Sequence, residues 1–288
     1  MAYWEAVASF IVDQDMDTAD YLLRFCDQNN SEVLSVNPWS GISAELFIYL
    51  SKVGSIARQR HHLRKLSTSA AISSAVQEAE RTLLQKGRAL EVLVCGHTTP
   101  RIEQLEDTGD CFTPIEHFQT LARVYRLAIL LELYRMFPEL LAEDTRTSFR
   151  AVLQHENHCQ RLNVLAINIL SLIASIPDTS GTRAVQMLAL IIAGSTLRNC
   201  SDEDTDNLGV GGHVQSMFSA KSCIKFWRTF VEDRLHKIDR YVGLDTVRRA
   251  SRIIRETWKR AEEETLEPRE VVHWIDVMVD KGLQTLLG

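Results

Sequence analysis

The stretch from Gln186 to Asp206 reads QMLALIIAGSTLRNCSDEDTD and passes abruptly from apolar to polar residues. No charged residue lies between Ala184 and Leu197, and most residues there are apolar. A helix that is hydrophobic on nearly all sides lies inside a protein. Gly194 and Ser195 are small, so that a neighbouring helix can cross closely there. The sequence therefore predicts a largely buried central helix near residues 184–198.

The rest of the chain shows helical periodicity and no convincing strand alternation. Apolar residues at spacings of three and four mark an amphipathic helix, as at Val247, Ala250, Ile254 and Trp258. We expect further helices over 2–13, 17–27, 43–66, 68–95, 114–137, 144–176, 217–241, 244–264 and 268–286. In the helix over 114–137, a charged strip that includes Glu132 and Arg135 flanks an apolar run. These patterns predict an all-α fold, a single multi-helix domain built around the central helix.

Composition excludes several classes of protein. The chain has 288 residues and a net charge of −6, without the basic surplus typical of a protein that binds nucleic acid over a broad surface. The longest uncharged run, Leu162 to Pro177, is shorter than the ~20 residues needed to span a bilayer. The N-terminus lacks the basic segment of a secretory signal. We expect a soluble protein with no membrane segment and no direct nucleic-acid binding.

The cysteines and histidines give a weak metal signal. No two of the six cysteines form a Cys-x-x-Cys pair, so we expect reduced, mostly buried thiols. His155, His158 and Cys159 lie on one helical face, but their spacing differs from the metalloprotease pattern. Solvent-facing polar residues are the favoured interpretation of this group.

A basic segment, Arg58 to Lys65, ends the helix that follows Ser43. Basic residues near a helix C-terminus interact favourably with the helix dipole, which is the simplest explanation. A nuclear-import or phosphate-binding patch is the alternative.

The acidic run Asp202-Glu-Asp-Thr-Asp206 follows the apolar helix directly. If the helix continues, Asp202 and Asp206 lie one turn apart and could share a Mg²⁺ ion, which binds one or two carboxylates together with substrate phosphates. The run resembles the aspartate-rich motif of class I terpene cyclases, but the second metal motif of those enzymes is not found. A solvated loop is the favoured interpretation.

Several sequence segments, taken in order, resemble the helical domain that follows the zinc cluster in fungal-specific transcription factors. They are NPWSGIS at 37–43, HFQTLARVYRLAILLELYRMFP at 117–138, LSLIASIPDTSG at 170–181, LALIIAGSTLRN at 188–199, VRRASRIIRETWKR at 247–260 and VVHWIDVMVDKGLQTLLG at 271–288. The resemblance covers roughly residues 36–288, which leaves 1–35 as an N-terminal helical extension. The tightly spaced six-cysteine zinc cluster of that family is not present in the sequence.

The resemblance implies a transcriptional regulator without its own DNA-binding module, located in the nucleus. It would act through protein partners, a homodimer among them, and could sense a small apolar ligand in its helical core. No cofactor is expected on this hypothesis. An enzyme is the alternative, with Asp202 and Asp206 holding Mg²⁺ for an isoprenoid diphosphate, in the cytoplasm. A third hypothesis is an inert fragment of a longer regulator.

Overall fold

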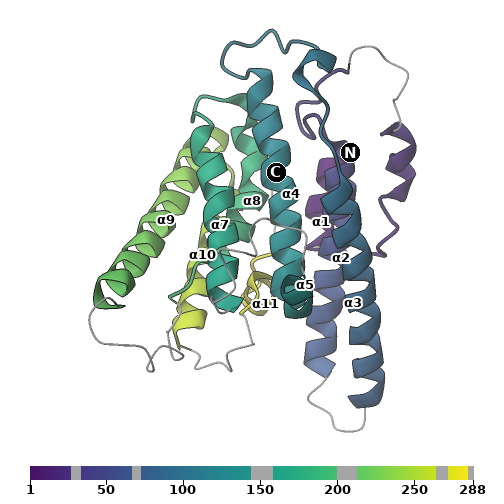
Figure 1. Cartoon of the computed structure of the whole chain (residues 1–288), viewed down its shortest axis with the longest axis vertical. Coiled ribbons are helices and arrows are strands. Elements are labelled where there is room, and N and C mark those ends of the chain that lie inside the picture. Colours follow the sequence, from purple (N-terminus) through teal and green to yellow (C-terminus); the bar gives the residue numbers. More distant parts are fainter. Residues whose placement is uncertain (27–33, 67–72, 144–157, 200–212, 264–271, 285–288) are drawn as a thin grey trace.

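The computed structural model describes residues 1–26, 34–66, 73–143, 158–199, 213–263 and 272–284, and for 73, 142, 143 and 213–221 the backbone alone. Within these ranges every regular element is a helix (Figure 1). The only β pairing there consists of two isolated bridges, Leu34 with Leu105 and Asn37 with Gly41. The prediction of an all-α fold is confirmed.

The helices agree broadly with the expected ranges, except that α11 covers only part of 268–286 and that 144–157 lies outside the described residues. In chain order the α-helices are α1 (Ala2–Ser9), α2 (Ala44–Leu66), α3 (Ser73–Gly96), α4 (Ile115–Met136), α5 (Pro138–Glu143), α7 (His158–Ser175), α8 (Met187–Thr196), α9 (His213–Val242), α10 (Asp245–Glu263) and α11 (Trp274–Asp280). The described part of the chain also contains the 3₁₀ helices η1 (Asp20–Phe25), η3 (Ile102–Gln104) and η4 (Gly181–Gln186).

Helix α4 lies between two groups of helices (Figure 1). On one side it contacts α2 and α3, and α2 in turn carries α1. On the other side it contacts α7 and α8, and α8 also packs against α9 and α10. The short helix α11 touches α2, α8 and α10, so it joins the two groups.

The central helix is confirmed as buried. All ten residues of α8 are buried, although the helix is shorter than predicted because η4 precedes it. A Cβ atom on Gly194 would lie 2.9 Å from Cγ1 of Val231, closer than real side chains approach, so α9 crosses α8 as closely as the small residue predicts. The indole Nε1 of Trp258 on α10 donates to the Gly194 carbonyl oxygen at 2.8 Å.

The N-terminal region differs from expectation. Helix α1 ends at Ser9, and the segment expected as an α-helix over 17–27 forms only the 3₁₀ helix η1. Helix α1 packs tightly on α2, because a Cβ atom on Gly54 would fall 2.0 Å from Oγ of Ser9. The boundary between residues 35 and 36 stays a prediction.

No helix in the described part of the chain is long and apolar enough to cross a membrane.

Candidate functional site

The structure describes only some of the candidate metal ligands. Asp202 and Asp206, with His155, lie outside the described residues. His158 is the first residue of α7, and burial and the nearby Arg161 lower its pKa. Among the described residues no group of three or more histidine, cysteine or carboxylate side chains is arranged to hold a metal ion.

The cysteines correct one expectation. Cys159 is disulfide-bonded, so the prediction of reduced thiols is wrong for this residue. Cys26, Cys95, Cys111 and Cys223 form no disulfide, but Cys111 and Cys223 are exposed rather than buried. The irregular spacing of the cysteines in the sequence indicated neither the disulfide at Cys159 nor the exposure of Cys111 and Cys223.

The basic segment at the end of α2 joins this helix to both ends of the chain. The Arg58 guanidinium lies 2.8 Å from a carboxylate oxygen of Asp13, which follows α1. His61 and Arg64 contact Asp276 of α11 at 2.5 and 3.2 Å. These contacts hold the basic segment against Asp13 and Asp276. The segment therefore has a structural role in addition to its interaction with the helix dipole.

A buried polar cluster lies where α4, α8 and α11 meet, and it was not expected from the sequence. Glu132 is fully buried and Arg135 is 3% exposed, so these residues of the expected charged strip lie in the core. One carboxylate receives three donors: Nε2 of His273 at 2.9 Å, Nε1 of Trp274 at 2.6 Å and the Arg135 guanidinium at 3.3 Å.

The Arg135 guanidinium extends the cluster to the C-terminal end of α8. It donates to the Ile192 carbonyl oxygen at 2.5 Å and to the hydroxyls of Ser195 and Thr196. The Ser195 and Thr196 hydroxyls donate to the same Ile192 carbonyl oxygen, so these groups and Arg135 form one network at the end of α8. Arg135 therefore fixes the end of the central helix and pairs with Glu132 at once.

The protonation states in this cluster follow from the geometry. Burial alone would raise the pKa of Glu132, but Arg135, His273 and Trp274 outweigh it and lower the pKa to about 2. Burial lowers the pKa of His273 despite the neighbouring carboxylate. Nδ1 of His273 accepts the Ile275 N–H at 3.2 Å, so the ring is neutral with its proton on Nε2, directed at Glu132. The cluster is a structural hydrogen-bond network, in which Nε of Arg135 has no partner among the described residues.

Helix α9 carries three aromatic side chains in mutual contact, of which Phe226 faces the solvent while Trp227 and Phe230 are half-buried against the core. The Phe226 side chain is 63% exposed and makes an edge contact with Trp227, with ring centroids 5.2 Å apart. Trp227 makes a similar contact with Phe230 at 5.4 Å. Aromatic residues are enriched in protein interfaces, so Phe226 is a candidate contact residue for another protein.

Comparison with known proteins gives a family. Searches of curated proteins and of solved structures found no match. The model of the family described as "Fungal specific transcription factor domain" matches residues 1–288. This match supports a protein of the transcription-regulator type, which agrees with the resemblance found in the ordered sequence segments. The chain belongs to the family of fungal-specific transcription factor domains.

Proposed function

We propose that this protein regulates transcription in the nucleus by binding other proteins, a second copy of itself first among them. Membership of the family supports the regulatory role. The exposed Phe226 ring, which contacts the half-buried Trp227, carries the proposal that the role depends on protein contacts, because aromatic residues are enriched in such interfaces.

The charges beside the aromatic cluster favour a second copy as the partner. Lys225, Thr229 and Asp233 are exposed and spaced by four residues, so they form one row along α9. Neither Lys225 nor Asp233 forms an ion pair within the described residues. Phe226 and Phe230 lie next to this row.

A two-fold axis at Thr229 would make this row self-complementary. Two α9 helices crossing antiparallel there would bring Lys225 of each copy opposite Asp233 of the other. An interface with two-fold symmetry uses the same surface on both copies, so each complementary pair occurs twice. Phe226 and Phe230 would supply the apolar part of the interface.

The experiment measures molar mass by light scattering after gel filtration, over a range of protein concentrations. We expect the wild-type chain to form a dimer and Lys225→Glu to weaken it, because two acidic side chains would then face each other twice. Adding Asp233→Lys to this variant should restore the dimer, since the charges are exchanged. Lys86→Glu, an exposed reversal on α3, serves as the control and should leave the dimer unchanged.

A wild-type chain that stays monomeric up to its solubility limit would contradict the homodimer. So would a double variant no better than Lys225→Glu alone. The described surroundings of α8 do not favour the small apolar ligand, because neighbouring side chains already contact this fully buried helix.

A further inference from the structure

Two pockets lie side by side along α10 and the end of α11, with volumes of about 300 and 330 Å³. Positions 245, 248, 249, 252, 256, 259, 260 and 263 line them from α10, at helical spacings that form one outward face. Lys281 lines both pockets and so forms their shared wall. The opposite face of α10, which includes Val247, Ile254 and Trp258, is buried.

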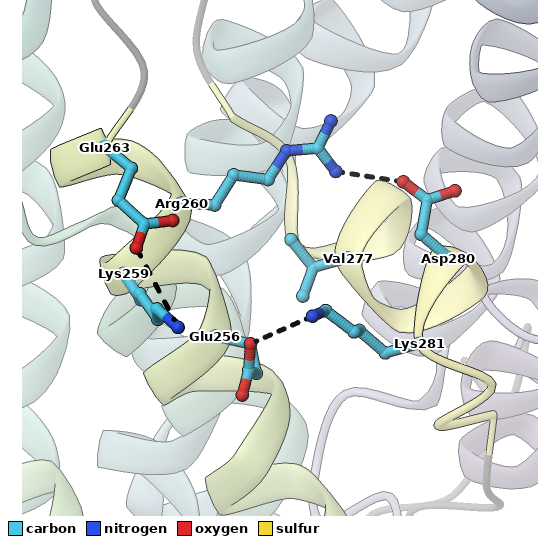
Figure 2. A pocket seen from close by; sticks show the side chains of 7 residues that line it. All are labelled: Glu256, Lys259, Arg260, Glu263, Val277, Asp280 and Lys281. Atoms are coloured by element: carbon cyan, nitrogen blue, oxygen red, sulfur yellow. Dashed lines mark hydrogen bonds and ion pairs between the residues drawn. The ribbon is translucent and has the colours of Figure 1, made fainter.

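The first pocket is electrically balanced. Figure 2 shows α10 side chains facing those of α11 across it. Arg260 lies 2.9 Å from Asp280, and the Lys281 amine lies 3.4 Å from Glu256. Every cation drawn there has a carboxylate neighbour, so this pocket offers no surplus charge to a ligand.

The second pocket has a surplus of positive charge. Arg248, Arg249 and Arg252 line it with Asp245 as its single acidic residue, while Lys281, which also lines it, already has Glu256 as a neighbour. Asp245 is shared, because Arg248 contacts one of its carboxylate oxygens at 3.3 Å and Arg249 the other at 2.8 Å. Arg252 is exposed and has no ion pair within the described residues.

The turn after α11 positions the remaining wall of this pocket. Gly282 has a φ of 63°, a left-handed conformation that favours glycine. The Leu283 N–H returns to the Met278 carbonyl oxygen at 2.9 Å, and the Leu283 side chain is buried. This helix-ending turn holds Lys281 at the rim and gives the pocket an apolar floor.

We propose that Arg248, Arg249, Arg252 and Lys281 form a docking site for an acidic segment of a partner protein. Guanidinium groups bind carboxylates with two parallel hydrogen bonds, which gives direction as well as strength. Arg248 and Arg252 lie about 6 Å apart along the helix axis, so they suit two carboxylates about one turn apart.

The surroundings favour a peptide over nucleic acid. The chain carries a net charge of −6, which repels a long polyanion. In the neighbouring pocket each of Glu256, Glu263 and Asp280 has a cation beside it, so the positive surplus is confined to the second pocket and does not continue along a path for a phosphate backbone. A peptide can place its acidic residues at the arginines and other residues beside these carboxylates.

This site rests on the proposal that the chain works through other proteins, but it does not depend on the homodimer through α9. The test uses the full chain and a fluorescent peptide of Glu pairs separated by Leu and Ala, with binding read by anisotropy at low and moderate salt. The control peptide has Gln in place of every Glu. We expect the acidic peptide to bind, the Gln peptide not to bind, and salt to weaken the binding.

Arg248→Gln combined with Arg252→Gln should weaken binding of the acidic peptide about tenfold, as the loss of two exposed charge contacts implies. Arg255→Gln is the matched control on the same helix, since Arg255 lies outside both pockets and pairs with Glu232 at 2.7 Å. It should leave binding unchanged. All variants should melt within about 2 °C of the wild type, because the changes are on the surface.

Equal binding by the double variant and the wild type would overturn the proposal, as would equal binding of the Gln peptide. A DNA duplex that binds more tightly than the acidic peptide, and loses binding in the double variant, would assign the pocket to nucleic acid instead. A monomeric chain that still binds the peptide as expected would refute the homodimer and support this site.

Discussion

Replacing Glu132 by Gln should destabilise the protein strongly, although the two side chains have almost the same size and shape. The carboxylate accepts from His273, Trp274 and Arg135, and the whole cluster is buried. An amide offers one acceptor oxygen and an NH₂ group, which would face another donor. The substitution also leaves the buried Arg135 guanidinium without its counter-charge.

The structure sets the size of the effect. Lowering the Glu132 pKa from 4.5 to about 2 corresponds to about 3 kcal/mol of stability at neutral pH. Breaking a buried ion pair by removing one partner costs about 3–5 kcal/mol, which agrees. We therefore expect the free energy of unfolding to fall by about 3–5 kcal/mol and the melting temperature by about 10 °C.

The pH dependence has a defined sign. Because the folded protein depresses the Glu132 pKa, the ionised carboxylate stabilises the fold fully above about pH 4.5, the ordinary value. This contribution is lost as the pH falls from about 4.5 towards about 2. The stability difference between the wild type and Glu132→Gln should shrink over the same range.

Urea denaturation monitored by circular dichroism measures the free energy of unfolding. Glu116→Gln, an exposed change on the same helix, is the control and should cost less than about 0.5 kcal/mol. Glu132→Leu with Arg135→Met removes both charges and should recover part of the loss. A loss below about 1 kcal/mol for Glu132→Gln, or a double variant less stable than the single one, would refute this reasoning.

Three further predictions concern the core and the alternative function. Gly194→Val should lower the melting temperature markedly, because even a Cβ atom there would lie 2.9 Å from Val231. Trp258→Phe should cost about 1–2 kcal/mol in urea denaturation through loss of the hydrogen bond to the Gly194 carbonyl. Mg²⁺ with pyrophosphate should leave the melting temperature unchanged. A shift that needs both components and disappears in Asp202→Asn would support diphosphate chemistry instead.

The helices and the buried central helix could be predicted because they rest on local patterns. The uncharged run of α8 and the apolar spacing of α10 each lie within one segment, and both are confirmed. The small residue at Gly194 also indicated a close crossing, although only the structure shows that Val231 approaches there.

The buried network could not be predicted because its members come from distant parts of the chain. Glu132 and His273 are 141 residues apart, and Glu132 looks like an ordinary solvent-facing charge on an amphipathic helix. In the sequence, the basic residues of α10 likewise look like the ordinary polar face of an amphipathic helix. Only the structure shows that Lys281, Gly282 and Leu283 of the next segment line a pocket together with these basic residues.

The most direct test of the regulatory role fuses the chain to an unrelated DNA-binding domain and measures a reporter gene in fungal cells. We expect the wild-type fusion to change reporter expression. We also expect Lys225→Glu to weaken this effect and Asp233→Lys to restore it. A wild-type fusion that is expressed, folded and nuclear yet leaves the reporter unchanged would contradict the regulatory role.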